Sequence, residues 1–185
     1  TVVLDKTGTV TSGRMTLSGV TVASGITSAD ALRIVGALES ASEHPVARAI
    51  AAAMTEAVPV RDFRSHAGRG VTGVVEGMQV FAGRPAFAAE QGAMVPPELA
   101  AAVAAGEARG TVVVAGWAIA GEALVARAVF AVADAVRPDS ADAVARLQSL
   151  GLRTVLLTGD NAGVAAAGAH EGGIDEVIAG GLPQG

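Results

Sequence analysis

The stretch TVVLDKTGT at residues 1–9 decides how the rest of the chain is interpreted. Its first four residues are mostly β-branched, which is typical of a buried strand in a parallel sheet. The next five residues are typical of a tight loop, because they include Gly8 and two threonines. Open α/β sheets place catalytic groups at the carboxyl ends of their strands. Asp5 is therefore either an ordinary charge at a strand end or a nucleophile.

Composition limits the classes of function that the chain can have. It has 185 residues, of which 51% are hydrophobic, enough for one compact domain or two small ones. Aromatic residues make up only 3%, and 18 acidic residues outweigh 13 basic ones, so we expect no nucleic-acid partner. The absence of cysteine excludes disulfides and thiolate metal sites.

No stretch of the sequence reaches the roughly 18 uninterrupted apolar residues that span a bilayer. The chain has no basic leader and begins inside a strand pattern, so we expect it to be soluble and part of a longer protein.

The kind of secondary structure that the sequence predicts changes twice along the chain. Buried-strand patterns that alternate with helical ones occur at both ends and favour a parallel, doubly wound sheet. The middle pairs β-rich runs around glycine turns, as hairpins do, and adds helical stretches. We predict an α/β domain built from residues 1–18 and 131–185, with an inserted α+β unit on an antiparallel sheet at 19–130.

Individual elements follow from local patterns. Ser28 is predicted to cap one helix, and Pro45 to begin another over PVARAIAAAMTEA. Further helices are expected at 85–91, 97–108, 140–150 and from about Asn161. Further strands are expected in the hairpins, at LRTVLLTG and at EVIA.

The loop after the first strand suits attack on phosphorus. A carboxylate such as Asp5 attacks a phosphoryl group only when cations reduce the repulsion between two anions, and Lys6 and Mg²⁺ would do this. Gly8 lets backbone approach a phosphate, while Thr7 and Thr9 offer hydroxyls.

LLTGDN at 156–161 is the second candidate. A strand that ends in Thr158, Gly159 and Asp160 would put a hydroxyl and flexible backbone beside the end of the first strand. The alternative is a strand-to-helix turn in which Asp160 or Asn161 caps the next helix.

Two further stretches lie in the inserted unit. In ESASEHP at 39–45, a bend would bring Glu39 and His44 to one side, although a histidine before proline is often only a helix-start residue. In GRGVTG at 68–73, Gly68 and Gly70 would give backbone room to a nucleotide, or serve only a turn or bulge. This stretch does not lie between a strand and a helix, which disfavours dinucleotide binding.

DKTGTVT at 5–11, SEHP at 42–45 and TGD at 158–160 resemble, in this order, the motifs of heavy-metal-transporting P-type ATPases, relatives of the haloacid dehalogenase superfamily. The resemblance implies ATP and Mg²⁺ as cofactors and Asp5 as the group that accepts the γ-phosphoryl. It implies that the Asp5 carboxylate and the Thr7 carbonyl bind Mg²⁺, with Lys6 beside them. The transferred phosphoryl would be held by Thr158 and Gly159, with Asp160 on the nucleotide side.

The same resemblance implies that Glu39 and His44 orient adenine. It implies nucleotide contacts by Gly68 and Gly70. The family often has Gly-Asn where this chain has Gly83-Arg84, so Arg84 is a candidate phosphate contact. Asp134 in VADAVRPD resembles the return hinge into the phosphorylation domain.

Function beyond the site follows from the same resemblance. The parent would be a membrane pump whose actuator and transmembrane domains are further partners. Its cytoplasmic face would carry this region, and its cargo would be a heavy-metal ion, with Cu(I) preferred and zinc or cadmium as the alternative. Thr7 stands where related phosphatases have an acid/base Asp, which argues against a soluble phosphatase with an α+β cap. A nucleotide-binding regulatory module without catalysis is a third possibility.

The family pattern continues beyond what this sequence contains. In the family a Lys follows the Leu-Pro seen at Leu182-Pro183, and a later Gly-Asp-Gly supplies another Mg²⁺ ligand. We therefore expect the phosphorylation domain to be incomplete at its C-terminal end. We expect the chain to bind adenine nucleotide but to phosphorylate poorly or not at all.

Overall fold

The computed structural model describes residues 1–118, 122–160 and 162–180. The chain forms two compact units: Thr1–Arg14 with Asp134–Gly185, and Met15–Ala133. The expected boundaries after residues 18 and 130 fall inside two long strands, β2 (Thr11–Val22) and β7 (Val125–Val136). Below, the two units are called the first and the second unit.

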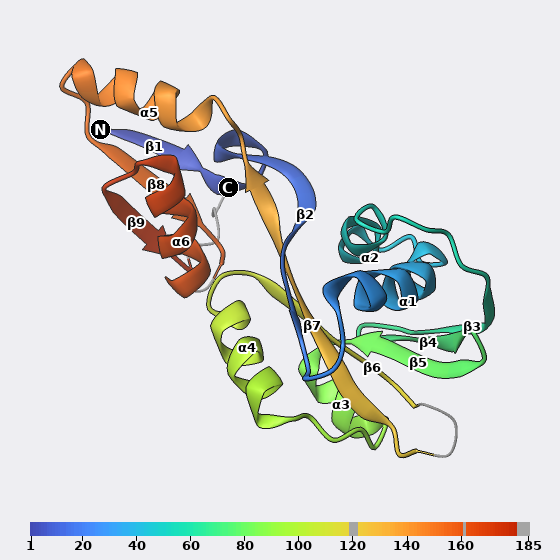
Figure 1. Ribbon diagram of the computed structural model, residues 1–185. Helices are drawn as coiled ribbons and strands as arrows, with labels where there is room; N and C mark the ends of the chain where they lie inside the picture. The colour runs from blue at the N-terminus through green and yellow to red at the C-terminus, as the bar shows by residue number, and fades with distance from the viewer. Residues whose placement is uncertain (119–121, 161, 181–185) are drawn as a thin grey trace. The chain divides into compact units, whose positions relative to one another are not determined.

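The first unit contains a three-stranded parallel sheet in the order β1-β8-β9. Its strands are β1 (Val2–Asp5), β8 (Thr154–Thr158) and β9 (Glu176–Ala179), joined by the helices α5 (Ser140–Ser149) and α6 (Ala162–Gly172). Figure 1 shows the three strands side by side, with α6 against β8 and β9. Buried Leu156 lies in the core between sheet and helices. The predicted parallel sheet is confirmed.

A tight loop, Lys6–Val10, follows β1. Gly8 has a φ of +80°, a conformation that residues other than glycine rarely adopt. This loop leads directly into β2.

The second unit is built on a six-stranded sheet in the order β2-β7-β6-β5-β4-β3. The strands not yet introduced are β3 (Val60–His66), β4 (Gly70–Val75), β5 (Met78–Gly83) and β6 (Thr111–Trp117). From β3 to β7, neighbouring strands are antiparallel, as predicted.

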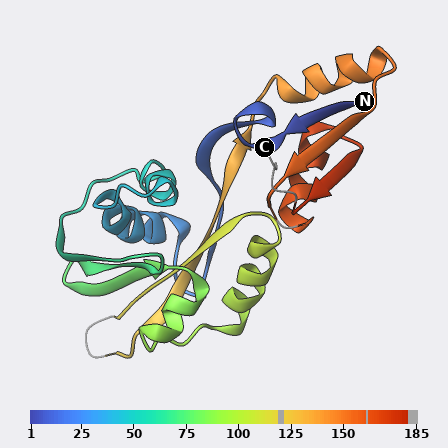
Figure 2. The same cartoon turned by 180° about the vertical axis from the view of Figure 1, so that it is seen from behind.

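Helices cover both faces of this sheet (Figures 1 and 2). The pair α1 (Ser28–Ser40) and α2 (Pro45–Ala51) packs on one face, where Trp117 is buried with Leu38 and Ile50. The helices α3 (Pro85–Glu90) and α4 (Pro97–Glu107) contribute to a separate core with Phe81 on the other face. Trp117, the only Trp of the chain, therefore packs inside the inserted unit.

Two local predictions are corrected. The residue that caps α1 is Thr27, whose hydroxyl accepts the Asp30 backbone N–H at 3.1 Å, and Ser28 is already the first helical residue. Both residues carry a hydroxyl, so sequence alone did not separate them. The second correction is that α2 ends at Ala51, before the end of its Ala-rich pattern.

None of the helices formed by the described residues has both the length and the apolarity needed to cross a lipid bilayer.

Candidate active site

Asp5 lies at the carboxyl edge of the parallel sheet in the first unit. It is the last residue of β1, is exposed, and is aligned with Leu157 of β8 in the strand register. Thr158, the next residue along β8, is buried. Residues near opposite ends of the chain thus meet at one sheet edge, the position that open α/β folds use for chemistry.

Lys6 and Asp160 form an ion pair at this edge. The Lys6 side chain is only 10% exposed, whereas that of Asp160 is 40% exposed. The Asp160 backbone N–H lies 3.2 Å from the Thr158 hydroxyl oxygen, which accepts from it. The fold therefore brings Lys6, Thr158 and Asp160 together, and the Lys6 ammonium group is a direct partner of the Asp160 carboxylate. Asn161, the alternative cap of α6, lies outside the described residues.

Gly159 lies between these residues with open space beside its α-carbon. It is exposed, so its backbone is accessible to an approaching anion. The role in holding a phosphoryl group that the sequence suggested for Gly159 stays a prediction.

Gly168 of α6 makes room for the stem of Lys6. A Cβ built on Gly168 would lie 3.5 Å from Lys6 Cε, which is ordinary van der Waals contact. We expect Gly168→Ala to leave Lys6 in place, and to gain up to about 1 kcal/mol from helix propensity. Gly168→Val adds branched methyl groups toward that stem and should cost about 1–2 kcal/mol.

Urea unfolding of the two variants checks this prediction, with Gly168→Ala as the matched control. Equal stability of the two variants would contradict the assigned contact.

The hydroxyl of Thr11 links the loop after β1 to Asp134. Thr11 is fully buried and donates to Asp134 Oδ2 at 2.6 Å, while the Gly8 backbone N–H donates to Thr11 Oγ1 at 3.3 Å. The Thr11 hydroxyl also lies 3.0 Å from the Lys6 carbonyl oxygen. Asp134 Oδ1 is buried, and among the described residues it has no hydrogen-bond partner. Thr11 was missed as a site residue, although it is the last Thr of DKTGTVT.

The sequence assigned Mg²⁺ to the Asp5 carboxylate and the Thr7 carbonyl, and both residues are exposed in the first unit. The described part of the chain contains no cluster of three or more His, Cys, Asp or Glu side chains that would hold a metal. Mg²⁺ commonly binds through one or two carboxylates, with waters and substrate phosphates as its other ligands. The Asp5 carboxylate and the Thr7 carbonyl fit a site of that kind.

Glu39 is a buried carboxyl group in the last turn of α1. Only 5% of the residue is exposed, and burial raises the pKa of its carboxyl group to about 7. No hydrogen bond or ion pair to this carboxyl group occurs within the described ranges. An unpaired polar group in such a position costs stability unless a ligand or water satisfies it.

His44 is the N-cap residue of α2. Its Nδ1 accepts the Val46 backbone N–H at 3.3 Å, so the neutral ring carries its proton on Nε2. The residue is exposed. The helix-start role considered for His44 is therefore confirmed, and the residue remains exposed to solvent.

Gly68 and Gly70 serve the turn between β3 and β4 differently. Gly68 has a φ of +67° and open space beside its α-carbon. Gly70 is paired with Gly83, and a Cβ on it would lie 2.3 Å from the Ala82 carbonyl oxygen and 2.6 Å from Phe87 Cδ1. Gly70 is thus required by strand and ring packing, which is the structural alternative that the sequence left open.

Arg84 follows this glycine pair. It is exposed, and its backbone N–H donates to the Arg69 carbonyl oxygen at 2.9 Å. The described contacts join Arg84 to the Gly68–Gly70 turn. In the part of the chain that the structure describes, no hydrogen bond or ion pair connects this group with Glu39 or His44.

His66 has partners that the sequence did not indicate. Its ring centroid lies 5.1 Å from that of Phe87, and its Nε2 lies 3.0 Å from the Thr72 hydroxyl oxygen. Thr72 reaches His66 through the pairing of β3 with β4, and Phe87 reaches it from α3, so neither contact follows from the local sequence.

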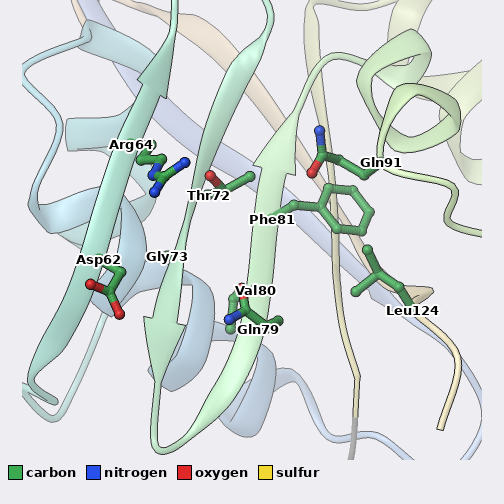
Figure 3. A pocket seen from close by; sticks show the side chains of 9 residues that line it. All are labelled: Asp62, Arg64, Thr72, Gly73, Gln79, Val80, Phe81, Gln91 and Leu124. Atoms are coloured by element: carbon green, nitrogen blue, oxygen red, sulfur yellow. The ribbon is translucent and has the colours of Figure 1, made fainter.

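A pocket of about 350 Å³ lies on the sheet face turned away from α1 and α2 (Figure 3). Phe81 and Leu124 form its apolar part, and polar side chains from β3, β4, β5 and the end of α3 surround them. Thr72 and Gly73, the last two residues of GRGVTG, line it, but neither Asp5 nor Glu39 does.

Comparison with known proteins places this geometry in a family. The family model for haloacid dehalogenase-like hydrolases matches residues 1–184. A copper-exporting P-type ATPase of Mycobacterium tuberculosis is 48% identical over 185 residues, which cover all of this chain and 24% of that protein. This chain therefore spans about a quarter of the length of such relatives.

Solved structures agree with the sequence comparison. A zinc-transporting PIB-type ATPase in the E2.Pi state has a TM-score of 0.82 and 30% identity, covering 98% of this chain and 29% of that one. The catalytic domain of the CPx-ATPase CopB-B has a TM-score of 0.68 at 22% identity, over 100% of this chain and 63% of that one, and shows the same fold.

The match along the chain, the sheet edge with Asp5, and the inserted antiparallel unit lead to one assignment. The chain belongs to the haloacid dehalogenase-like hydrolase family and corresponds to the catalytic region of heavy-metal-transporting P-type ATPases.

Proposed function

We propose that this chain binds ATP and accepts its γ-phosphoryl group on the Asp5 carboxylate. The observation that supports this most directly is the sheet edge where exposed Asp5 lies beside buried Thr158, with the Lys6–Asp160 ion pair next to it. This arrangement offers a nucleophile, a fixed cation and hydrogen-bond donors at one place, as phosphoryl transfer requires.

In the proposed reaction, an Asp5 carboxylate oxygen forms a bond to the γ-phosphorus, and the bond from that phosphorus to the bridging oxygen of ADP breaks. Lys6 reduces the repulsion between the two anions. The Thr158 hydroxyl and the Gly159 backbone N–H hold the transferred group. Mg²⁺, held by the Asp5 carboxylate and the Thr7 carbonyl, would supply further neutralisation of phosphate charge.

Thr7 would give the acyl phosphate a longer life. A threonine hydroxyl is a poor general acid or base compared with a carboxyl group, so hydrolysis lacks a proton acceptor at that position. This favours a pump intermediate over a phosphatase. Rapid turnover of p-nitrophenyl phosphate would favour the soluble phosphatase with an α+β cap instead.

The second unit would bind the adenosine part of ATP. The Glu39 carboxyl group would accept a hydrogen bond from the adenine amino group, and the His44 ring would stack on the purine. The Gly68–Gly70 turn would allow close approach of the nucleotide, while Asp134 would act as the return hinge. Adenosine would satisfy the otherwise unpartnered Glu39 carboxyl group.

The parent protein would couple this chemistry to export of a heavy-metal cation across a membrane, with this region on the cytoplasmic side. Cu(I) is the preferred cargo because the copper-exporting relative is more similar in sequence than the zinc-transporting one. Zinc or cadmium is the alternative. The ion would be bound by transmembrane segments, and actuator and transmembrane domains would be partners within the parent chain.

Substitution of His44 tests the adenine site. We expect His44→Ala to weaken ATP binding about 10-fold or more, since loss of a stacked ring costs about 1–3 kcal/mol. Titration calorimetry with Mg-ATP measures the change. His170, exposed on α6 in the first unit, provides the matched control His170→Ala. Unchanged affinity in His44→Ala would remove this histidine from the site.

A further inference from the structure

Three charged side chains cluster at the Gly68–Gly70 turn. Arg69 lies within the turn, Arg84 follows β5, and Glu90 ends α3. Arg69 Nη1 lies 3.1 Å from Glu90 Oε2, and Arg84 Nη2 lies 3.7 Å from Glu90 Oε1. One carboxylate therefore faces two guanidinium groups, and the cluster has a net charge of +1.

The backbone that carries both arginines is fixed. The Arg84 N–H donates to the Arg69 carbonyl oxygen at 2.9 Å, and the Arg69 N–H donates to the His66 carbonyl oxygen at 2.9 Å. Buried Phe87 packs against the adjacent Gly70–Gly83 pair. The backbone that carries the two cations is therefore already ordered, and binding of an anion has only their side chains left to immobilise.

The side chains themselves remain accessible to an anion. Those of Arg69, Arg84 and Glu90 are 48%, 54% and 36% exposed. Ion pairs this exposed contribute little to stability, so a multiply charged anion can displace the Glu90 carboxylate. Guanidinium groups suit phosphate because they donate in a planar fork.

We propose that Arg69 and Arg84 together bind the phosphate groups of the nucleotide, and that Glu90 competes with those phosphates for the same two guanidinium groups. The proposal rests on the ATP binding proposed above. It makes Arg69 and Arg84 determinants of specificity for a nucleoside triphosphate over a nucleoside.

Titration calorimetry with two ligands, Mg-ATP and adenosine, tests the assignment. We expect Arg69→Ala and Arg84→Ala each to weaken ATP binding about 5- to 10-fold and to change adenosine binding less than about 2-fold. Glu90→Gln should tighten ATP binding about 2- to 4-fold at about 50 mM salt, and less at about 300 mM, because salt screens exposed charges. Arg109→Ala, an exposed arginine at the α4–β6 turn, is the matched control.

The experiment separates failure of phosphate binding by Arg69 and Arg84 from failure of the proposed nucleotide binding. If adenosine binds but ATP affinity is unchanged in both arginine variants, or if Glu90→Gln weakens ATP binding, the assignment alone is overturned. Equal losses for ATP and adenosine in the arginine variants would also overturn it, because they indicate a structural effect. If neither ligand binds the unsubstituted chain, the proposed nucleotide site is overturned and the assignment with it.

Discussion

Asp5→Asn should abolish formation of the phosphorylated protein, by more than about a thousand-fold. The amide has nearly the shape of the carboxylate but lacks its negative charge and its nucleophilic oxygen. The experiment uses a hybrid in which this chain replaces the matching quarter of the copper-exporting relative. Acid-quenched incorporation of ³²P from labelled ATP, with release by hydroxylamine, measures the acyl phosphate.

The specificity of this effect is checked in two ways. ATP should still bind to Asp5→Asn, because the proposed adenosine contacts lie in the second unit. Asp139→Asn is the matched control, since Asp139 is an exposed carboxylate of the first unit that pairs with Arg137. Hydroxylamine-labile label that persists in Asp5→Asn would show that another residue is the acceptor.

The placement of Asp5 could be predicted from sequence because it depends on regular structure. TVVL and TVLL are both short buried-strand patterns, and parallel strands bring their carboxyl ends to one edge. The contact between Lys6 and Asp160 could not be predicted in the same way. These residues are 154 positions apart. The strand pattern places both at the same edge of the sheet, but it does not predict which side chains there form an ion pair.

The separate roles of Gly68 and Gly70 could not be predicted from the sequence. GRGVTG indicates a turn, but it does not separate the role of Gly68 from that of Gly70. The distinction depends on the register of β4 with β5, which places Gly70 opposite Gly83 and under the Phe87 ring. The contact of His66 with Thr72 depends on the pairing of β3 with β4, and its contact with Phe87 depends on the packing of α3. Both are equally invisible in the local pattern.

Burial of Glu39 should make stability fall as pH rises, and Glu39→Gln should remove this dependence. Burial raises the pKa of the Glu39 carboxyl group from its ordinary value of 4.5 to about 7. Below about pH 4.5 the group is protonated in both the folded and the unfolded chain. Between these two values the unfolded chain releases its proton while the folded chain keeps it, so the free energy of unfolding decreases as pH rises.

The raised pKa of Glu39 sets the size of the change in the free energy of unfolding. Above pH 7 the buried carboxylate lowers the free energy of unfolding by at most about 3 kcal/mol relative to a neutral group. Glu39→Gln keeps nearly the same volume and carries no charge, so it should be more stable than the original chain at pH 8 by an amount approaching this limit. At pH 4.5 the two proteins should differ by less than about 1 kcal/mol.

Urea unfolding at several pH values measures the difference between the two proteins, in which the contributions of other titrating groups cancel. Glu43→Gln is the matched control, because Glu43 is exposed in the turn between α1 and α2 and its carboxylate remains in water. Its stability difference from the original chain should not vary with pH. If Glu39→Gln and the original chain keep a constant difference from pH 4.5 to 8, the Glu39 carboxyl group is not desolvated in the folded chain. The proposed adenine acceptor would then be an ordinary solvated carboxylate, with no cost of burial for a nucleotide to relieve.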